Sequence, residues 1–228
     1  MSVLKFVLGI IKKSLVDFYE YLFKIVFVNL ICFTILILPF IFLYIFEDFW
    51  LLFVLLIISY LLAGPLFLSA LNLLKAVIDR EDPSVKVLFS GIKVFFKRGL
   101  QGWLLSSLIY LILLVDIYFF LQRSGNLLMF IIAVLFFYLL IFFSMSQLYF
   151  WGLLMLNPQQ KLWIVFKKSL LLTLDNLLTS FLILVIVLVL TVILFVTGVG
   201  LPIAFLGIIS LVIINLTRAI MDKYLKKE

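Results

Sequence analysis

The side chains of this chain that could do chemistry are few, and several of them stand inside long apolar stretches. Asp116, in LLVDIYFF, is the ionisable residue placed deepest in such a stretch, and Asn29 is isolated in another. Ser144, Gln147 and Trp151 follow one another at i, i+3 and i+7, which places them on one face of a helix. These five residues form the candidate intramembrane polar site.

Each candidate has two possible roles if the apolar stretches cross a membrane. Asp116 is either a carboxylate that reaches the lipid headgroups or pairs with a neighbouring helix, or it belongs to a proton or ion relay. The uncharged polar residues either join helices by hydrogen bonds or line a cavity for a small ligand. The sequence does not separate these alternatives, because it does not fix how each helix is rotated.

Several kinds of chemistry lack the residues that they need. The chain has no histidine, which removes the usual general base near neutral pH and the commonest metal ligand. Its single cysteine, Cys32, allows neither a disulfide within one chain nor a paired-cysteine metal site. No nucleophile stands beside a base. We therefore expect no enzymatic activity, no cofactor and no metal site.

The composition is that of a membrane protein. Of the 228 residues 67% are hydrophobic and only 13% are charged, and the mean hydropathy is +1.40. A water-soluble domain could not cover so much apolar surface. The 18 Lys and Arg against 11 Asp and Glu fit loops that bind an anionic lipid leaflet. We expect no nucleic-acid partner.

The apolar stretches predict six transmembrane helices, each of about 20 residues or more. They cover approximately residues 25–46, 50–76, 100–121, 127–156, 177–196 and 201–216. Gly64-Pro65 should kink the second helix, because proline removes a backbone hydrogen bond. Pro202 is well placed to open the sixth helix.

The positive charges predict the orientation. Every lysine and arginine except Arg123 falls in the two terminal segments or in the segments after the second and fourth helices. Basic loops stay in the cytoplasm, so both termini of this multi-pass membrane protein should be cytoplasmic. The outer turns hold Arg123 with Glu47 and Asp48. The segment MSVLKFVLGIIKKSLVDFYE has only a short apolar run, and we expect it to be retained rather than cleaved.

The inner segments resemble one another, at a spacing of roughly 75 residues. Asp82-Pro83 and Asn157-Pro158 each have the form of a helix N-cap followed by proline at the first helical position. Each precedes a basic amphipathic stretch, and residues 2–21 are the counterpart before the first hairpin. The all-α fold is thus a single membrane domain, residues 1–228, made of three helical hairpins joined by interfacial helices on the cytoplasmic side. Its three units are residues 1–78, 79–156 and 157–228.

The stretch after Pro83 is the clearest of these amphipathic segments. Its lysines form a stripe beside an apolar face, so we expect a helix that lies on the membrane rather than through it. This segment either anchors the protein to the inner leaflet or provides a docking surface for a partner. The candidate docking surface is Asp82, Pro83, Lys86, Lys93 and Lys97.

One part of the chain resembles a known family. Gly64-Pro65 is followed by ALNLLKAVIDREDPSVKVLFSGIKVFFKRGLQG, residues 70–102, in which a helix tail, a charged segment and a Phe- and Lys-rich segment come in turn. This order resembles the YesL-like family of bacterial integral membrane proteins, a domain of unknown function. Arg98-Gly99 departs from the family, in which an asparagine is expected after the basic residue. The resemblance implies a companion of carbohydrate uptake systems, with ABC transporter subunits as partners.

Three functions are compatible with the sequence. The preferred interpretation is a non-enzymatic accessory or regulatory component of a carbohydrate uptake system. The second is a substrate-binding subunit or permease of a small-molecule transporter, although the chain lacks a nucleotide-binding loop of the G-x-x-x-x-G-K-[ST] type. The third is a protein that interacts with lipids or scrambles them at the inner leaflet. The sequence does not indicate the oligomeric state.

Overall fold

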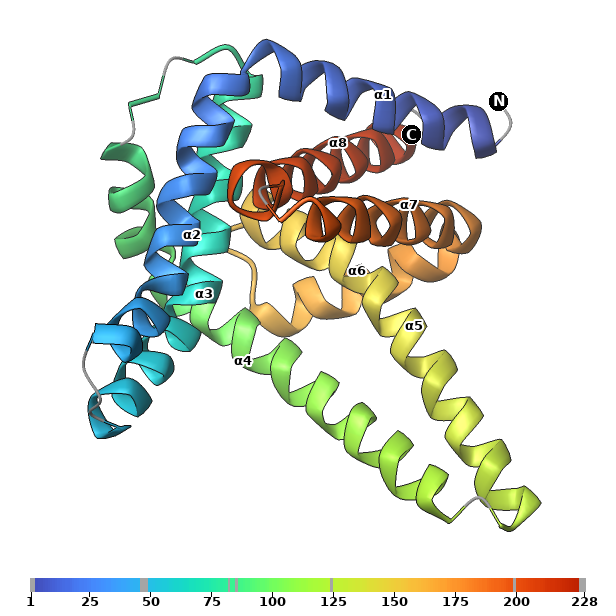
Figure 1. Ribbon diagram of the computed structural model, residues 1–228. Helices are drawn as coiled ribbons and strands as arrows, with labels where there is room; N and C mark the ends of the chain where they lie inside the picture. Colours follow the sequence, from blue (N-terminus) through green and yellow to red (C-terminus); the bar gives the residue numbers. More distant parts are fainter. Residues whose placement is uncertain are drawn as a thin grey trace.

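The described part of the chain is all-α, as the sequence predicted. The computed structural model describes residues 3–45, 49–81, 83–84, 86–123, 125–198 and 200–225. Over these ranges every regular element is a helix (Figure 1). The elements are α1 (Val3–Glu20), α2 (Leu22–Ile45), α3 (Phe49–Ile78), α4 (Lys86–Gln122), α5 (Leu127–Leu156), α6 (Leu162–Asp175), α7 (Leu177–Val196), the π-helix η1 (Leu201–Phe205) and α8 (Leu206–Leu225).

Among the described residues, six helices are long and apolar enough to cross a membrane, which confirms the predicted number. Their spans are Leu22–Phe42, Trp50–Ile78, Lys86–Gln122, Leu127–Leu156, Leu177–Val196 and Leu201–Tyr224. Pro202 stands in the first turn of the last span, as expected, and that turn is a π-helix. Figure 1 shows α3 changing direction about midway along its length, where Gly64 and Pro65 lie.

The amphipathic segment after Pro83 is not a separate helix. The helix begins at Lys86 rather than at Pro83 and continues without a break to Gln122, so the expected surface helix and the third span form one element of 37 residues. Its interior contains no proline, and its buried glycines let it run close against neighbouring helices. At 1.5 Å per residue, α4 is about 55 Å long and exceeds the roughly 30 Å of a hydrocarbon core. Asp82 lies outside the described residues.

The prediction that Asn157-Pro158 opens a helix is wrong. Asn157 instead closes α5, because its backbone N–H donates to the carbonyl oxygen of Leu153. The chain then turns, and α6 begins only at Leu162, with Lys161 at the N-cap position. Asparagine is suited to either end of a helix, and here the apolar pattern of α5 continues up to it.

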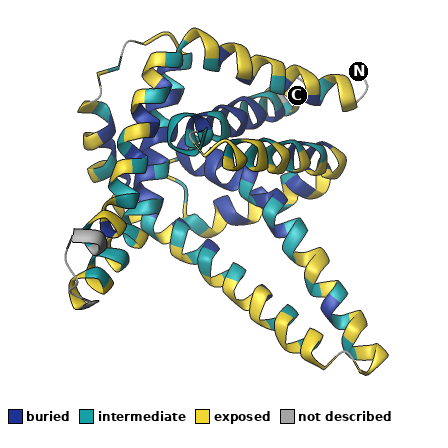
Figure 2. Cartoon of the chain, in the orientation of Figure 1, coloured by how far each residue is buried: buried dark blue, intermediate teal, exposed yellow. Residues whose placement is uncertain are grey.

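The buried core lies at the ends of α2 to α5 that are away from the α2–α3 and α4–α5 turns. It includes the second halves of α3 and α5 and most of α8, which is the most buried of the six spans. Figure 2 shows buried residues at the centre of the fold and exposed residues on the arms that lead to these two turns. Trp50 and Leu127, each next to one of these turns, expose 76% and 75% of their surface.

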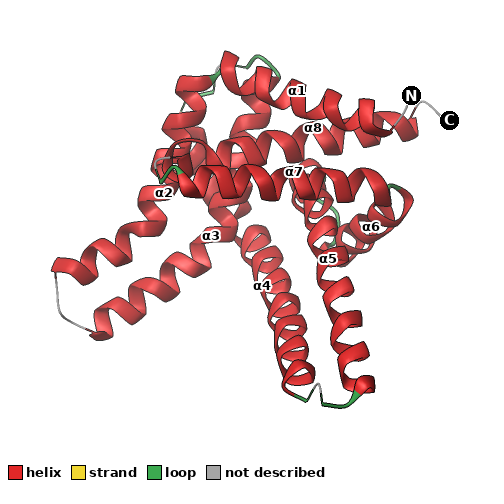
Figure 3. Cartoon of the chain, turned by 45° about the vertical axis from the view of Figure 1, so that its right-hand side comes forward, coloured by secondary structure: helices red, strands yellow, loops and turns green. Residues whose placement is uncertain are grey.

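The three pairs of spans spread apart rather than lying parallel. In Figures 1 and 3, α7 and α8 run across α2 and α3, and the α4–α5 turn lies far from the α2–α3 turn. The most extensive helix contact joins α3 to α4, across the predicted boundary between the first two units. α7 makes its main contacts with α5, α1 and η1, and α8 packs on α1, α5 and α3.

Glycines set the closest approaches between these helices. A Cβ atom on Gly99 would lie 2.6 Å from the Cα of Pro65, and one on Gly64 would lie 2.3 Å from the carbonyl oxygen of Gly99. These distances are shorter than any real Cβ contact. The backbones of α3 and α4 therefore touch at a point where only glycine fits.

We predict that Gly99→Ala destabilises the protein by about 1–3 kcal/mol, because its methyl group would meet the backbone at Pro65. Gly9→Ala in α1 is the matched control, since its Cβ would have nothing within 4 Å and alanine raises helix propensity. Thermal unfolding of the two purified variants in one detergent measures the difference. Equal midpoints would contradict the close contact.

Candidate functional site

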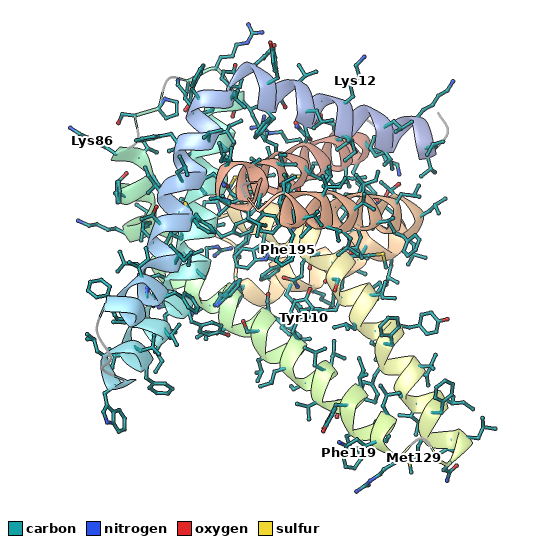
Figure 4. All side chains as sticks on the ribbon, viewed as in Figure 1. Lys12, Lys86, Tyr110, Phe119, Met129 and Phe195 are labelled. Carbon is teal, nitrogen blue, oxygen red and sulfur yellow. The ribbon has the colours of Figure 1, made fainter. Side chains whose placement is uncertain are left out.

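The predicted polar residues of α5 meet polar residues of α4. The Ser106 hydroxyl donates to Oε1 of Gln147 at 2.9 Å, and the Tyr110 hydroxyl donates to Oγ of Ser144 at 3.2 Å. Ser144 in turn donates to the carbonyl oxygen of Leu140 in its own helix, at 2.8 Å. Figure 4 labels Tyr110 on the side of α4 that faces α5. These hydrogen bonds join α4 to α5.

Aromatic rings continue this contact towards the core. The ring of Trp151 lies 6.4 Å from that of Trp103 on α4 and 5.2 Å, edge to face, from that of Phe67 on α3. Nε1 of Trp103 and Nε2 of Gln147 are buried donors for which the described residues provide no acceptor. This cluster can donate hydrogen bonds, but among its described residues there is no carboxylate, amine or imidazole that could activate the serine hydroxyls.

Asp116 does not join this cluster. It lies on α4 almost two turns beyond Tyr110, towards the outer turn, and is half-buried. Its carboxylate has no hydrogen-bond or ion-pair partner among the described residues. The fold thus places Gln147 and Ser144 of α5 against polar residues of α4, while Asp116 lies apart from them.

Asn29 also lies apart from this cluster, and its side chain hydrogen-bonds to the start of the sixth span. Its side-chain N–H groups donate to the carbonyl oxygens of Leu201, at 3.0 Å, and Pro202, and its Oδ1 accepts from the backbone N–H of Gly207 at 3.0 Å. These backbone groups lie where the helix loosens into η1. Unpaired backbone groups in an apolar interior cost several kcal/mol, so the single buried amide of Asn29 stabilises the irregular start of the sixth span.

A second buried amide joins α1 to α8, and sequence reasoning missed its partners on α1. Nδ2 of Asn215 donates to Oδ2 of Asp17 at 2.8 Å and to Oγ of Ser14 at 3.1 Å. Asp17 is 9% exposed. The signal was the spacing of Ser14 and Asp17 with the apolar residues Val7 and Ile10, since these four form one buried stripe along α1.

The lysines of the candidate docking surface lie on the first turns of α4. Lys86, Lys93 and Lys97 are exposed, and their ammonium groups have no acceptor among the described residues. The opposite face of this segment is held against α3, where the Ser69 hydroxyl donates to the carbonyl oxygen of Leu88 at 2.6 Å. The half-buried Pro83 precedes the helix.

An ion pair fixes the neighbouring end of α3. Both terminal nitrogens of Arg218 on α8 contact the carboxylate of Asp79, each at 2.8 Å. Within the described ranges, no group of three or more His, Cys, Asp or Glu side chains is placed to hold a metal ion. Comparison with known proteins found no matching family model, curated protein or solved structure.

We predict that Asn29→Leu destabilises the protein by about 2 kcal/mol or more, because Gly207 and two carbonyl groups would lose a partner in an apolar setting. Thr191→Val is the control, because its hydroxyl bonds only to Val187 in its own helix. Chemical or thermal unfolding in detergent compares them. A loss no larger for Asn29→Leu than for Thr191→Val would contradict the role of Asn29.

Proposed function

We propose that the six spans cross a bacterial cell membrane with both termini in the cytoplasm, and that α1 and the first turns of α4 lie at the inner leaflet. The placement of charge supports this orientation. In Figure 4, Lys12 and Lys86 lie at one end of the molecule, and Phe119 and Met129, beside an outer turn, lie at the other. A long helix with lysines at one end fits a segment that extends beyond the hydrocarbon and reaches anionic headgroups.

The protein is proposed to act there without catalysis, as an accessory or regulatory component of a carbohydrate uptake system. One observation carries the proposal, namely the stripe of Lys86, Lys93 and Lys97. These cations are exposed on a helix that packs against α3, and none pairs with a carboxylate of the described chain. They are therefore free to meet acidic groups of a partner, and the resemblance to the YesL-like family indicates ABC transporter subunits.

The use of the polar side chains favours this function over a permease. Asn29, Asn215 and Gln147 bind neighbouring helices rather than one shared cavity. Asp116 lies apart from them on α4. Charged groups available to a partner lie at the ends of helices, so an interaction at the membrane surface requires no rearrangement of the buried bundle.

We predict that a cysteine at Ser90 is protected from a membrane-impermeant maleimide in intact cells, whereas one at Gly125 is labelled. Both positions are exposed, one beside the lysine stripe and one in an outer turn. A Cys32→Ser background removes the native thiol, which is buried. Labelling at position 90 in intact cells, or labelling at position 125 only after the membrane is permeabilised, would contradict the orientation.

We further predict that the native protein, purified from its own membranes in mild detergent, carries subunits of an ABC transporter. Replacing Lys86, Lys93 and Lys97 together by glutamine should reduce their recovery several-fold, because three charges that face the partner are lost. The control replaces Lys5, Lys12 and Lys13, three exposed lysines of α1. Recovery of no transporter subunit, or equal losses in both triple variants, would contradict this function.

A further inference from the structure

A cavity of about 490 Å³ opens between α5, α6 and α8. Its lining combines apolar and polar side chains. Leu153 comes from α5, Leu172 from α6 and Met221 from α8, while Gln160, Lys168 and Tyr224 are polar lining residues. Its size falls within the roughly 300–1,000 Å³ of small-molecule sites.

The polar part of the lining includes a positive charge, and further cations lie on neighbouring residues. The exposed Lys168 ammonium donates one hydrogen bond, to Oε1 of Gln160 at 3.1 Å, so two of its three N–H groups stay available. Arg98 donates from its guanidinium to the carbonyl oxygen of Asn157, another lining residue, at 2.9 Å. Lys223 donates to Oδ1 of Asn176 at 2.8 Å.

The carboxylate of Asp175 already accepts a hydrogen bond. The Tyr224 hydroxyl donates to Oδ2 of Asp175 at 3.2 Å and accepts from Nδ2 of Asn176 at 3.2 Å. Asp222 follows Met221 on α8 and is exposed. Of these cations, Lys168 lines the cavity and Arg98 contacts the lining residue Asn157, while the carboxylate of Asp175 already accepts a hydrogen bond from the lining residue Tyr224. The local charge favours an anion.

We propose that this cavity binds one anionic phospholipid, with the phosphate at the Lys168 ammonium and the start of one acyl chain between Leu153, Leu172 and Met221. The cavity is open and holds only part of such a lipid, so the remaining chain stays in the bilayer. Basic pockets between transmembrane helices on the cytoplasmic side recognise anionic headgroups in this way. A soluble anion would leave the apolar lining residues uncovered, and a neutral lipid would give the Lys168 ammonium no anionic partner.

The test titrates the purified full-length protein, in neutral detergent micelles, with phosphatidylglycerol, phosphatidylcholine or inorganic phosphate, and measures bound lipid by native mass spectrometry and the thermal midpoint. Wild-type protein should bind one phosphatidylglycerol in preference to phosphatidylcholine and respond little to phosphate. Lys168→Gln should weaken phosphatidylglycerol binding about fivefold, as expected for the loss of one basic residue at a lipid surface. Lys168→Arg should retain most of the binding.

Lys167→Gln is the matched control, because Lys167 is the adjacent exposed lysine of α6 and does not line the cavity. Equal weakening by Lys167→Gln and Lys168→Gln would overturn the site in favour of general surface attraction. Equal binding of inorganic phosphate and phosphatidylglycerol would overturn the lipid as ligand. Unliganded midpoints of both variants at the wild-type value show that neither substitution acts through unfolding.

Discussion

Close approach of helix backbones at glycine is the interaction on which this fold depends. Lipid chains are as apolar as leucine side chains, so spanning helices gain little from burying leucine against each other and associate through close packing and hydrogen bonds. A Cβ atom on Gly152 would lie 2.1 Å from Oγ1 of Thr217, and one on Gly207 would lie 2.2 Å from Cγ2 of Ile25. These contacts bring α5 and α2 against α8, as the contact of Gly64 and Gly99 brings α3 against α4.

These contacts lie in one half of the molecule, and this placement has a functional consequence. The helices are tightly packed at one end, and the α2–α3 and α4–α5 pairs separate from each other towards their turns (Figures 2 and 3). The few buried amides, Asn29 and Asn215 among them, satisfy polar groups within that packed half. Among the polar groups that remain available are Lys86, Lys93 and Lys97 of α4 and Lys168 of α6. This distribution fits a protein that works at a membrane surface rather than through a central pathway.

The sequence predicted the all-α class and the six spans because each span is a local property of a long apolar run. It failed at element boundaries, where tertiary contacts decide. The stretch after Pro83 was predicted as a separate surface helix, yet packing on α3 at Gly91 and Gly99 makes residues 86–99 the start of α4. Ser144 and Gln147 were rightly placed on one face, but only the rotation of α4 shows that Ser106 and Tyr110 are their partners. The role of Asn29 depends on a π-helix more than 170 residues away, for which no local signal exists.

A double-mutant cycle at Gly152 and Thr217 tests most directly whether glycine contacts hold the helices together. Gly152→Ala should destabilise the wild-type protein, because its methyl group would meet the Thr217 side chain. In a Thr217→Gly background the same substitution should cost much less, giving a coupling energy of about 1–2 kcal/mol in the free energy of unfolding. Strict additivity of the two substitutions would show that α5 and α8 do not approach at this point, and would contradict the account.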